Sequence, residues 1–176
     1  VLVADVARGV GLDYSAFVVV DVTSMPFEIV AVFRDNQLSP MMFPTVINKI
    51  GTLYNQAYVL PEINDIGQQV VDILNNEIEY ENILSSQIKG RAGQVIGGGF
   101  ASKYQLGIRT TAQLKRLGCS NLKSLVEEQK FIIRDFDIIN ELSTFVARGQ
   151  SYEAEEGSHD DLAMCLVIFA WLVAQD

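Results

Sequence analysis

Residues 1–33 read VLVADVARGVGLDYSAFVVVDVTSMPFEIVAVF, and this stretch decides the fold. It predicts three β-strands, Val1–Val6, Ser15–Val22 and Phe27–Phe33, which are rich in β-branched and aromatic residues. Glycines mark the first connection and a Ser-Met-Pro sequence marks the second. Because connections this short usually join antiparallel neighbours, the stretch predicts an antiparallel meander.

The rest of the chain predicts helices that alternate with shorter strands. Apolar residues at helical spacing indicate a helix over Met41–Tyr54, and the strand Ala57–Glu62 follows it. Since helices flank this strand, we expect a parallel crossover connection. Asn64 is expected to cap the next helix. The other expected elements are a strand at Ile83–Ser86, a helix that opens at Thr110 and Thr111, a helix over Leu122–Glu128, a strand at Phe131–Ile133, and helices over Phe136–Arg148 and Leu162–Gln175.

Three antiparallel strands followed by alternating helices and strands predict an α/β domain with a mixed sheet. The ribonuclease H-like fold has this order of elements. In that fold, acidic residues on the first strand, the fourth strand and a late helix meet at one point. The chain has 176 residues, no internal repeat and no linker, so residues 1–176 are expected to form a single domain. It begins inside a strand without a Met, which suggests a domain of a larger protein.

The net charge of −9 is distributed unevenly along the chain. Residues 1–81 carry three basic and eleven acidic side chains, and residues 82–150 carry ten basic and five acidic ones. Residues 151–176 carry six acids and no Lys or Arg. A basic middle between acidic flanks fits a polyanion on one face and cations on another, although an unevenly charged, solvated surface gives the same pattern.

Composition argues against a membrane protein and against a disulfide-stabilised one. The longest apolar run, Leu162–Ala174, is shorter than the ~20 residues that span a bilayer. No signal-like segment opens the chain. Cys119 and Cys165 form no C-x-x-C motif, so we expect reduced thiols in a reducing compartment.

Acidic residues stand at three places where a strand or helix begins or ends. Taken singly, each has an ordinary explanation: a turn-forming Asp, an exposed Glu at a strand end, or acids that stabilise a helix start. A buried carboxylate must be hydrogen-bonded, protonated or bound to a cation, so convergence of several without basic partners suggests a divalent-metal site. The acids are Asp5 after the first strand, with Asp13 placed to face back toward it; Glu62 after the fourth strand; and Asp160 and Asp161 at the last helix, next to the sole His159.

Several separated stretches resemble one protein family. They are EEGSHDDLAM (residues 155–164), Asp5 followed by GLDY (11–14), and LPEIN (60–64), together with LGCSNLKSLVE (117–127) and LVIFAWL (166–172). In this order they resemble the nuclease domain of the large terminase subunit of T-even-type tailed bacteriophages. The resemblance extends over most of the chain.

The resemblance implies the ribonuclease H-like fold and an endonuclease that cuts concatemeric viral DNA at the initiation and termination of genome packaging, with little sequence specificity. It places the catalytic acids at Asp5, Glu62 and Asp161, with Asp13 and Asp160 as further metal ligands and His159 in a supporting place. The implied cofactor is Mg²⁺ or Mn²⁺, as two ions, and hard carboxylate oxygens suit such ions.

The implied partners are double-stranded DNA and, in the full-length protein, an ATPase domain, the portal and the small terminase subunit, in the cytoplasm of the infected bacterial host. The motor's Gly-x-x-x-x-Gly-Lys-Ser/Thr loop is absent from this chain, so ATP hydrolysis is not expected of it. Two other functions stay open. One is a nucleic-acid-binding module of the same fold without cleavage. The other is an actin-like-fold ATPase, which needs a second Gly-rich turn that the sequence lacks.

Basic residues in the middle of the chain define an expected DNA path. Contacts to phosphate give affinity without sequence reading. The Gly-rich segment Lys89–Gly107 looks long for the family, and we expect a β-hairpin or mobile flap there that clamps DNA beside the acids, or else a tolerated surface insertion. The residues expected on the path are Lys89, Arg91, Lys103, Arg109, Lys115 and Arg116.

Overall fold

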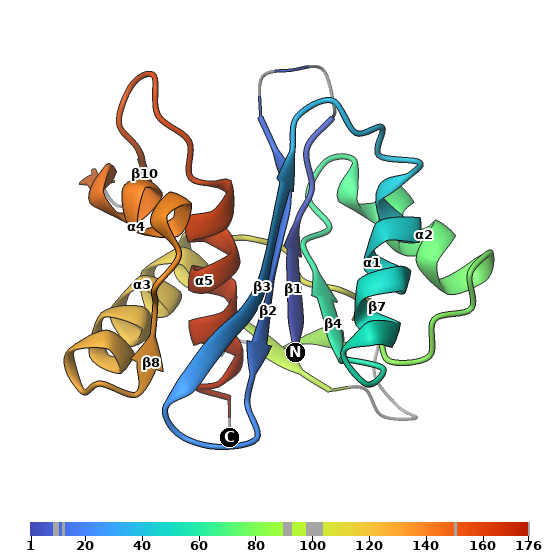
Figure 1. Cartoon of the computed structure of the whole chain (residues 1–176), viewed down its shortest axis with the longest axis horizontal. Coiled ribbons are helices and arrows are strands. Elements are labelled where there is room, and N and C mark those ends of the chain that lie inside the picture. The colour runs from blue at the N-terminus through green and yellow to red at the C-terminus, as the bar shows by residue number, and fades with distance from the viewer. Residues whose placement is uncertain (9–10, 12, 90–92, 98–103, 150, 176) are drawn as a thin grey trace.

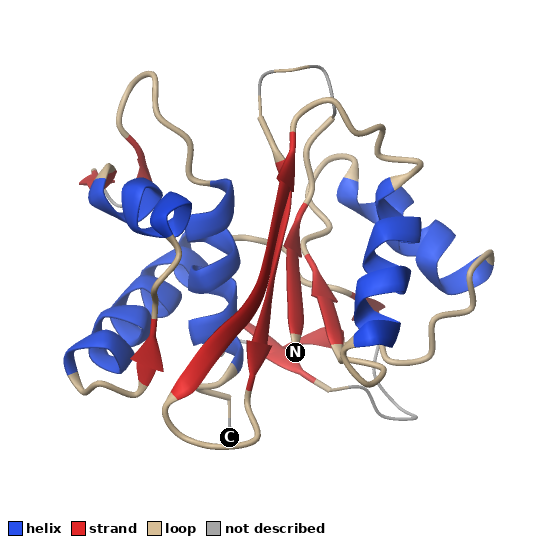
Figure 2. Cartoon of the chain, in the orientation of Figure 1, coloured by secondary structure: helices blue, strands red, loops and turns tan. Residues whose placement is uncertain are grey.

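A five-stranded mixed sheet forms the centre of the molecule, and helices cover both of its faces (Figure 1; Figure 2). The structure is a computed structural model that describes residues 1–8, 11, 13–89, 93–97, 104–149 and 151–175. Helices α1 and α2 lie on one face, and α3, α4 and α5 lie on the other (Figure 1). The helices are α1 (Phe43–Leu53), α2 (Gly67–Asn76), α3 (Ala112–Glu127), α4 (Phe136–Ser143) and α5 (Asp161–Leu172).

The strand order is β4-β1-β2-β3-β8. The first three strands form the predicted antiparallel meander, β4 pairs with β1 in parallel, and β8 pairs with β3 in parallel. This arrangement confirms the predicted α/β fold with a mixed sheet and the parallel crossover into the fourth strand. The strands of this sheet are β1 (Leu2–Asp5), β2 (Ser15–Asp21), β3 (Phe27–Asp35), β4 (Val59–Pro61) and β8 (Phe131–Ile132).

Burial on both faces explains the apolar composition of the central strands. Successive side chains of a strand point to opposite faces. In β2, Val18 and Val20 belong to the core beneath α3 and α5, whereas Phe17 and Val19 belong to the core beneath α1 and α2. The sheet is therefore fixed between two separate cores, and the ends of its strands keep defined positions.

Helix α5 is buried along nearly its whole length, from Asp161 to Trp171. A helix that is apolar on all sides belongs in the interior, which accounts for the long apolar run at this place. Among the helices of the described part of the chain, none is long and apolar enough to cross a membrane.

Helix α3 is one continuous helix, where the sequence predicted two shorter ones. A Cβ atom at Gly118 would lie 2.3 Å from the backbone oxygen of Val167, so glycine here permits α3 to pack closely on α5. The interruption predicted between Leu117 and Leu122 was wrong, because Gly118 serves packing and does not end the helix.

A second correction concerns the predicted helix Phe136–Arg148. Helix α4 ends at Ser143, and the next residues form a hairpin of β9 (Phe145–Arg148) and β10 (Ser151–Ala154). Aromatic residues of the two strands stack across the hairpin, since the rings of Phe145 and Tyr152 are 6.1 Å apart. The spacing of apolar residues gives no information about pairing between strands, and here this pairing overrides the helical pattern.

The Gly-rich part of the chain contributes a small antiparallel sheet of β5 (Ser85–Lys89), β6 (Gly93–Ile96) and β7 (Tyr104–Leu106), in the order β6-β5-β7. It joins the β4 edge, because Leu84 N–H donates to Val59 O at 2.8 Å and Ile108 N–H donates to Pro61 O at 3.0 Å. β6 forms an antiparallel hairpin with β5, most of which precedes Lys89, and β7 pairs with the other side of β5; the role of the segment as a DNA clamp stays a prediction. Residues 90–92 and 98–103, including Arg91 and Lys103, lie outside the described part.

Candidate functional site

Asp5 and Glu62 lie side by side at the ends of two neighbouring strands. Strands β1 and β4 are parallel neighbours, and the backbone N–H of Glu62 donates to Ala4 O at 2.8 Å. The carboxyl ends of adjacent parallel strands meet at one edge of a sheet, so both acids are carried to the same place. Among the neighbouring charges, Glu62 has the largest effect on the Asp5 carboxyl.

Burial, followed by the charge of Glu62 and its hydrogen bond, raises the pKa of Asp5 well above its usual value. The charges of Asp161 and Asp160 act in the same direction. Glu62 therefore opposes loss of the Asp5 proton when no cation is present.

Asp161 opens α5 and is 8 % exposed. Burial first, and then the charges of Glu141, Asp160 and Asp13, raise its pKa to about 7 against the opposing effect of the Tyr14 backbone N–H. One of its two carboxylate oxygens, Oδ2, is buried without a hydrogen-bond partner. A buried, unpartnered oxygen is costly and marks a place where a cation would be stabilised.

The neighbouring predicted residues have distinct contacts. Asp160 Oδ2 accepts from the backbone N–H of Ala154 at 3.2 Å. His159 lies edge-on against Tyr14, with ring centroids 4.9 Å apart, and its Nδ1 is 3.8 Å from Asp161 Oδ2. Asp13 is exposed, and its charge raises the pKa of Asp161.

These acids fit a divalent cation in their chemistry. They are hard oxygen donors, their like charges oppose one another, and the Asp161 oxygen lacks a partner. In the described residues, however, no three His, Cys, Asp or Glu side chains are already arranged to hold an ion.

Asn64 supports Glu62 and does not cap a helix. Helix α2 begins after Ile66 without a side-chain cap, so the predicted N-cap was wrong. The Asn64 amide donates to Glu62 Oε1 at 3.1 Å and to Thr110 O at 3.1 Å. It thereby joins the acid at the end of β4 to the segment that leads into α3.

Gly67, the first residue of α2, holds the Glu62 backbone from the other side. A Cβ atom there would lie 2.1 Å from Glu62 O. We expect Gly67→Ala to lower the free energy of unfolding by about 1–3 kcal/mol, because the backbone must move to relieve this overlap. Urea denaturation measures the loss, and Gln69→Ala, an exposed change in the same helix, is the control. If Gly67→Ala were as stable as the wild type, α2 could move away from Glu62 without a loss of stability.

Glu141 is the buried acid that the sequence analysis missed. It is 2 % exposed, and its Oε2 accepts from the backbone N–H groups of Leu162 and Ala163 at 2.7 and 2.9 Å. A signal for it existed: Glu141 is three residues after Ile138 in α4, on the apolar face of that helix.

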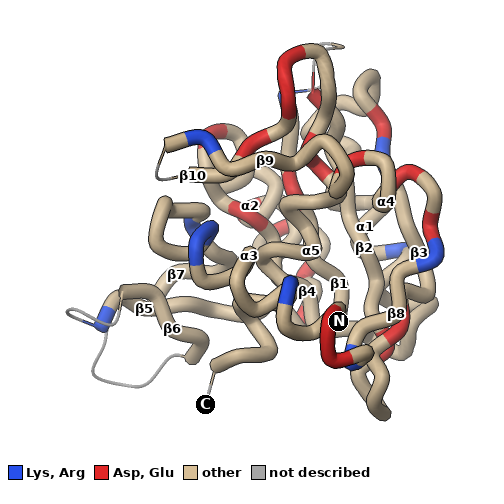
Figure 3. Tube along the Cα trace, turned by 90° about the vertical axis from the view of Figure 1, so that its left-hand side faces the viewer, with Lys and Arg blue, Asp and Glu red and all other residues tan. Residues whose placement is uncertain are grey.

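The basic residues expected on the DNA path differ in how exposed their side chains are. The face that carries β5, α3 and β9 holds Lys and Arg on each of these elements (Figure 3). Lys89, Arg109 and Arg116 are exposed. Lys115 is half-buried and donates to Tyr152 O at 3.2 Å, so it fastens the β9–β10 hairpin to α3.

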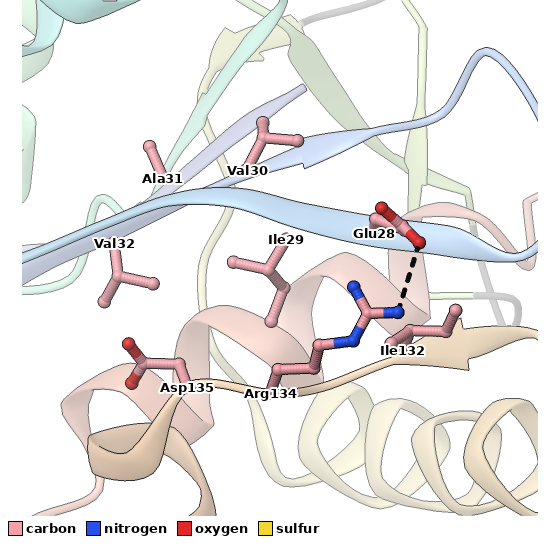
Figure 4. A pocket seen from close by; sticks show the side chains of 8 residues that line it. All are labelled: Glu28, Ile29, Val30, Ala31, Val32, Ile132, Arg134 and Asp135. Atoms are coloured by element: carbon pink, nitrogen blue, oxygen red, sulfur yellow. Dashed lines mark ion pairs between the residues drawn. The ribbon is translucent and has the colours of Figure 1, made fainter.

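A separate cleft of about 420 Å³ lies between β3 and the chain that follows β8 (Figure 4). Glu28 and Arg134 face each other across it at 3.8 Å. The cleft is at the opposite edge of the sheet from β4, and none of the predicted site residues lines it.

The meander, the parallel fourth strand and the acids at the strand ends and the start of α5 define a ribonuclease H-like α/β domain. The chain belongs to the Terminase RNaseH-like domain family, whose model matches residues 2–169.

Solved structures of similar fold include the large terminase nuclease from thermophilic phage G20c. With bound magnesium it has a TM-score of 0.70 and 19% identity, over 98% of this chain and 79% of that one. With bound cobalt the TM-score is 0.69 at 19% identity and the same coverage. A third structure of that nuclease has a TM-score of 0.60 and 18% identity, over 99% of this chain and 80% of that one.

Proposed function

We propose that this chain is a metal-dependent DNA endonuclease. The observation that carries the proposal is the meeting of Asp5 and Glu62 at the ends of two parallel strands in a member of the terminase family. Support also comes from the phage G20c nuclease, which has been crystallised with magnesium and with cobalt.

The catalytic roles fall to Asp5, Glu62 and Asp161. When bound, Mg²⁺ or Mn²⁺, which we propose as two ions, would activate the attacking water and stabilise the leaving 3′-oxygen of a DNA phosphodiester. The charges of both Glu62 and Asp161 act on Asp5, so Asp5 is the acid that would serve as a ligand to both ions. Glu62 and Asp161 would each complete one side. Asp160 and Asp13 add negative charge, and His159 orients water or phosphate beside Asp161.

In the biological setting that we propose, the chain is the single nuclease domain, residues 1–176, in the C-terminal part of a larger terminase of the T-even type. It cuts concatemeric viral DNA with little sequence preference at the initiation and termination of packaging. Its partners are double-stranded DNA, an ATPase domain, the portal and the small terminase subunit, in the cytoplasm of the infected host.

Incubation with supercoiled plasmid tests this function. We expect nicked and linear products with Mg²⁺ or Mn²⁺ and none after EDTA is added. A folded protein that binds DNA without cutting it under any divalent ion would favour the competing function, a binding module with structural acids.

We expect the exposed basic residues to govern DNA affinity. Arg109→Ala and Arg116→Ala should each weaken binding and reduce the slope of log K against log salt by about 1, since one phosphate contact is lost. Fluorescence anisotropy at several salt concentrations measures the slope. Lys49→Ala, an exposed change in α1 on the other face of the sheet, is the matched control. An unaltered slope in both arginine variants would remove this face from the DNA path.

A further inference from the structure

The start of α5 is capped from another helix. The first N–H groups of a helix have no partners within it, and a side chain just before the helix usually accepts from them. Asp160 stands at that position in α5 but makes no such bond, because its carboxylate is turned to Ala154 N–H. Glu141 of α4 caps the helix instead, because its Oε2 accepts from Leu162 N–H at 2.7 Å and from Ala163 N–H at 2.9 Å.

The second oxygen of Glu141 is tied to the sheet. Oε1 lies 3.4 Å from Nη1 of Arg34, at the end of β3, and Arg34 also pairs with Asp137 of α4 at 2.9 Å. The Arg34 guanidinium lies over the ring of Tyr14, 5.1 Å from its centroid. Tyr14 in turn contacts His159, whose Nδ1 lies 3.8 Å from Asp161 Oδ2.

Two sets of contacts therefore hold Asp161 in place. One is the capping of the first turn of α5 by Glu141, and the other runs from Arg34 through Tyr14 to His159. The two N–H groups that Glu141 binds directly follow Asp161 in the chain. A shift of the first turn of α5 would move the Asp161 carboxylate, while the rest of the helix stays anchored by its buried residues.

We propose that Glu141 is a positioning residue for the nuclease site: by capping α5 from α4, it fixes the Asp161 carboxylate where the cation is bound. The inference rests on the proposed function for the role of Asp161, and concerns a residue that touches neither cation nor DNA. Partners that orient a metal ligand in this way typically influence metal affinity or activity 10–100-fold.

Two substitutions separate capping from charge. Glu141→Leu keeps the approximate size and removes both oxygens. Glu141→Gln keeps one oxygen for the two N–H groups, and Arg34 retains Asp137 as its partner. Ile47→Ala, in the core beneath α1 on the other face of the sheet, serves as a control for lost stability alone.

Amide hydrogen exchange and Mn²⁺ calorimetry are the readouts. In metal-free protein we expect Glu141→Leu to lose protection at Leu162 and Ala163 while the middle of α5 stays protected. It should bind Mn²⁺ about 10–100-fold more weakly than Glu141→Gln, which loses the same charge but keeps the cap, whereas Ile47→Ala retains the wild-type affinity. If Glu141→Leu does not fold, Glu141→Asp, whose oxygens are withdrawn by one methylene, takes its place.

Unchanged exchange at Leu162 and Ala163, or an equal loss of Mn²⁺ affinity in Ile47→Ala, would overturn the positioning role. A wild-type protein that binds Mn²⁺ but cuts no DNA would overturn the proposed nuclease function alone, because the exchange and affinity results still decide the role of Glu141. A wild-type protein that binds no Mn²⁺ would overturn both.

Discussion

Asp5→Asn is expected to remove nearly all DNA cleavage and to leave the fold intact, and Glu62→Gln and Asp161→Asn should do the same. Each change keeps the size of the side chain and removes one anionic ligand, so cation binding suffers more than packing. Because the acids repel one another without a cation, each variant should melt at the same temperature as the wild type or higher, and the increase for Asp161→Asn should be largest at pH 7 and above. Plasmid nicking in Mg²⁺ and thermal melting in EDTA measure the two effects.

The control for these substitutions is Glu77→Gln, an exposed acid at the end of α2 that should leave cleavage unchanged. An active Asp161→Asn protein would transfer the role of main ligand to Asp160. Full activity in Asp5→Asn would contradict the proposed site altogether, since Asp5 is the acid on which the other charges act.

The second large effect is a dependence of stability on pH in metal-free protein. The pKa of Asp161 is raised from its usual 3.8 to about 7, so between these values the folded protein binds more protons than the unfolded chain. The free energy of unfolding therefore falls as the pH rises from 4 to 7, by up to roughly 1.4 kcal/mol per pH unit for this group. Below pH 4 both states are protonated and the effect is absent.

The difference between wild type and Asp161→Asn measures this contribution together with the effect of the Asp161 charge on Asp5. In EDTA, Asp161→Asn should become increasingly more stable than the wild type as the pH rises from 5 to 8. Mg²⁺ should stabilise the wild type at pH 8 more than at pH 5, since a cation then replaces the proton. If the melting temperatures of the two proteins changed with pH in the same way across this range, Asp161 would not be buried as described.

The sheet could be predicted from the sequence because its strands carry their signal locally. The apolar runs around Phe17 and Ile29 and the short turns between them specify the meander without distant information. The last helix was equally visible, since the run from Leu162 is apolar on all sides. Local patterns of this kind survive in the fold because they agree with the burial of both sheet faces.

Elements that depend on distant partners could not be predicted. The β9–β10 hairpin needs pairing between Phe145 and Ala154, and the continuity of α3 depends on the contact of Gly118 with Val167. In both places the local signal was overruled by packing.

At the candidate site, the sequence identified acids but not their supports. Asp5, Glu62 and Asp161 stand at element ends, where charged residues are conspicuous. Asn64 and Glu141 look like a cap and a helix-surface acid until the chain is folded, because their partners are 46 and 21 residues away. The strand ends bring the acids together, and these two residues hold them there.

A crystal soaked in Mn²⁺ provides the most direct test of the account. Anomalous diffraction at the manganese edge should show a peak within bonding distance of carboxylate oxygens of Asp5, Glu62 and Asp161. The same peak should disappear in a crystal of Asp5→Asn. Manganese bound elsewhere at saturating concentration, with no peak beside these three acids, would contradict a metal-dependent nuclease site there.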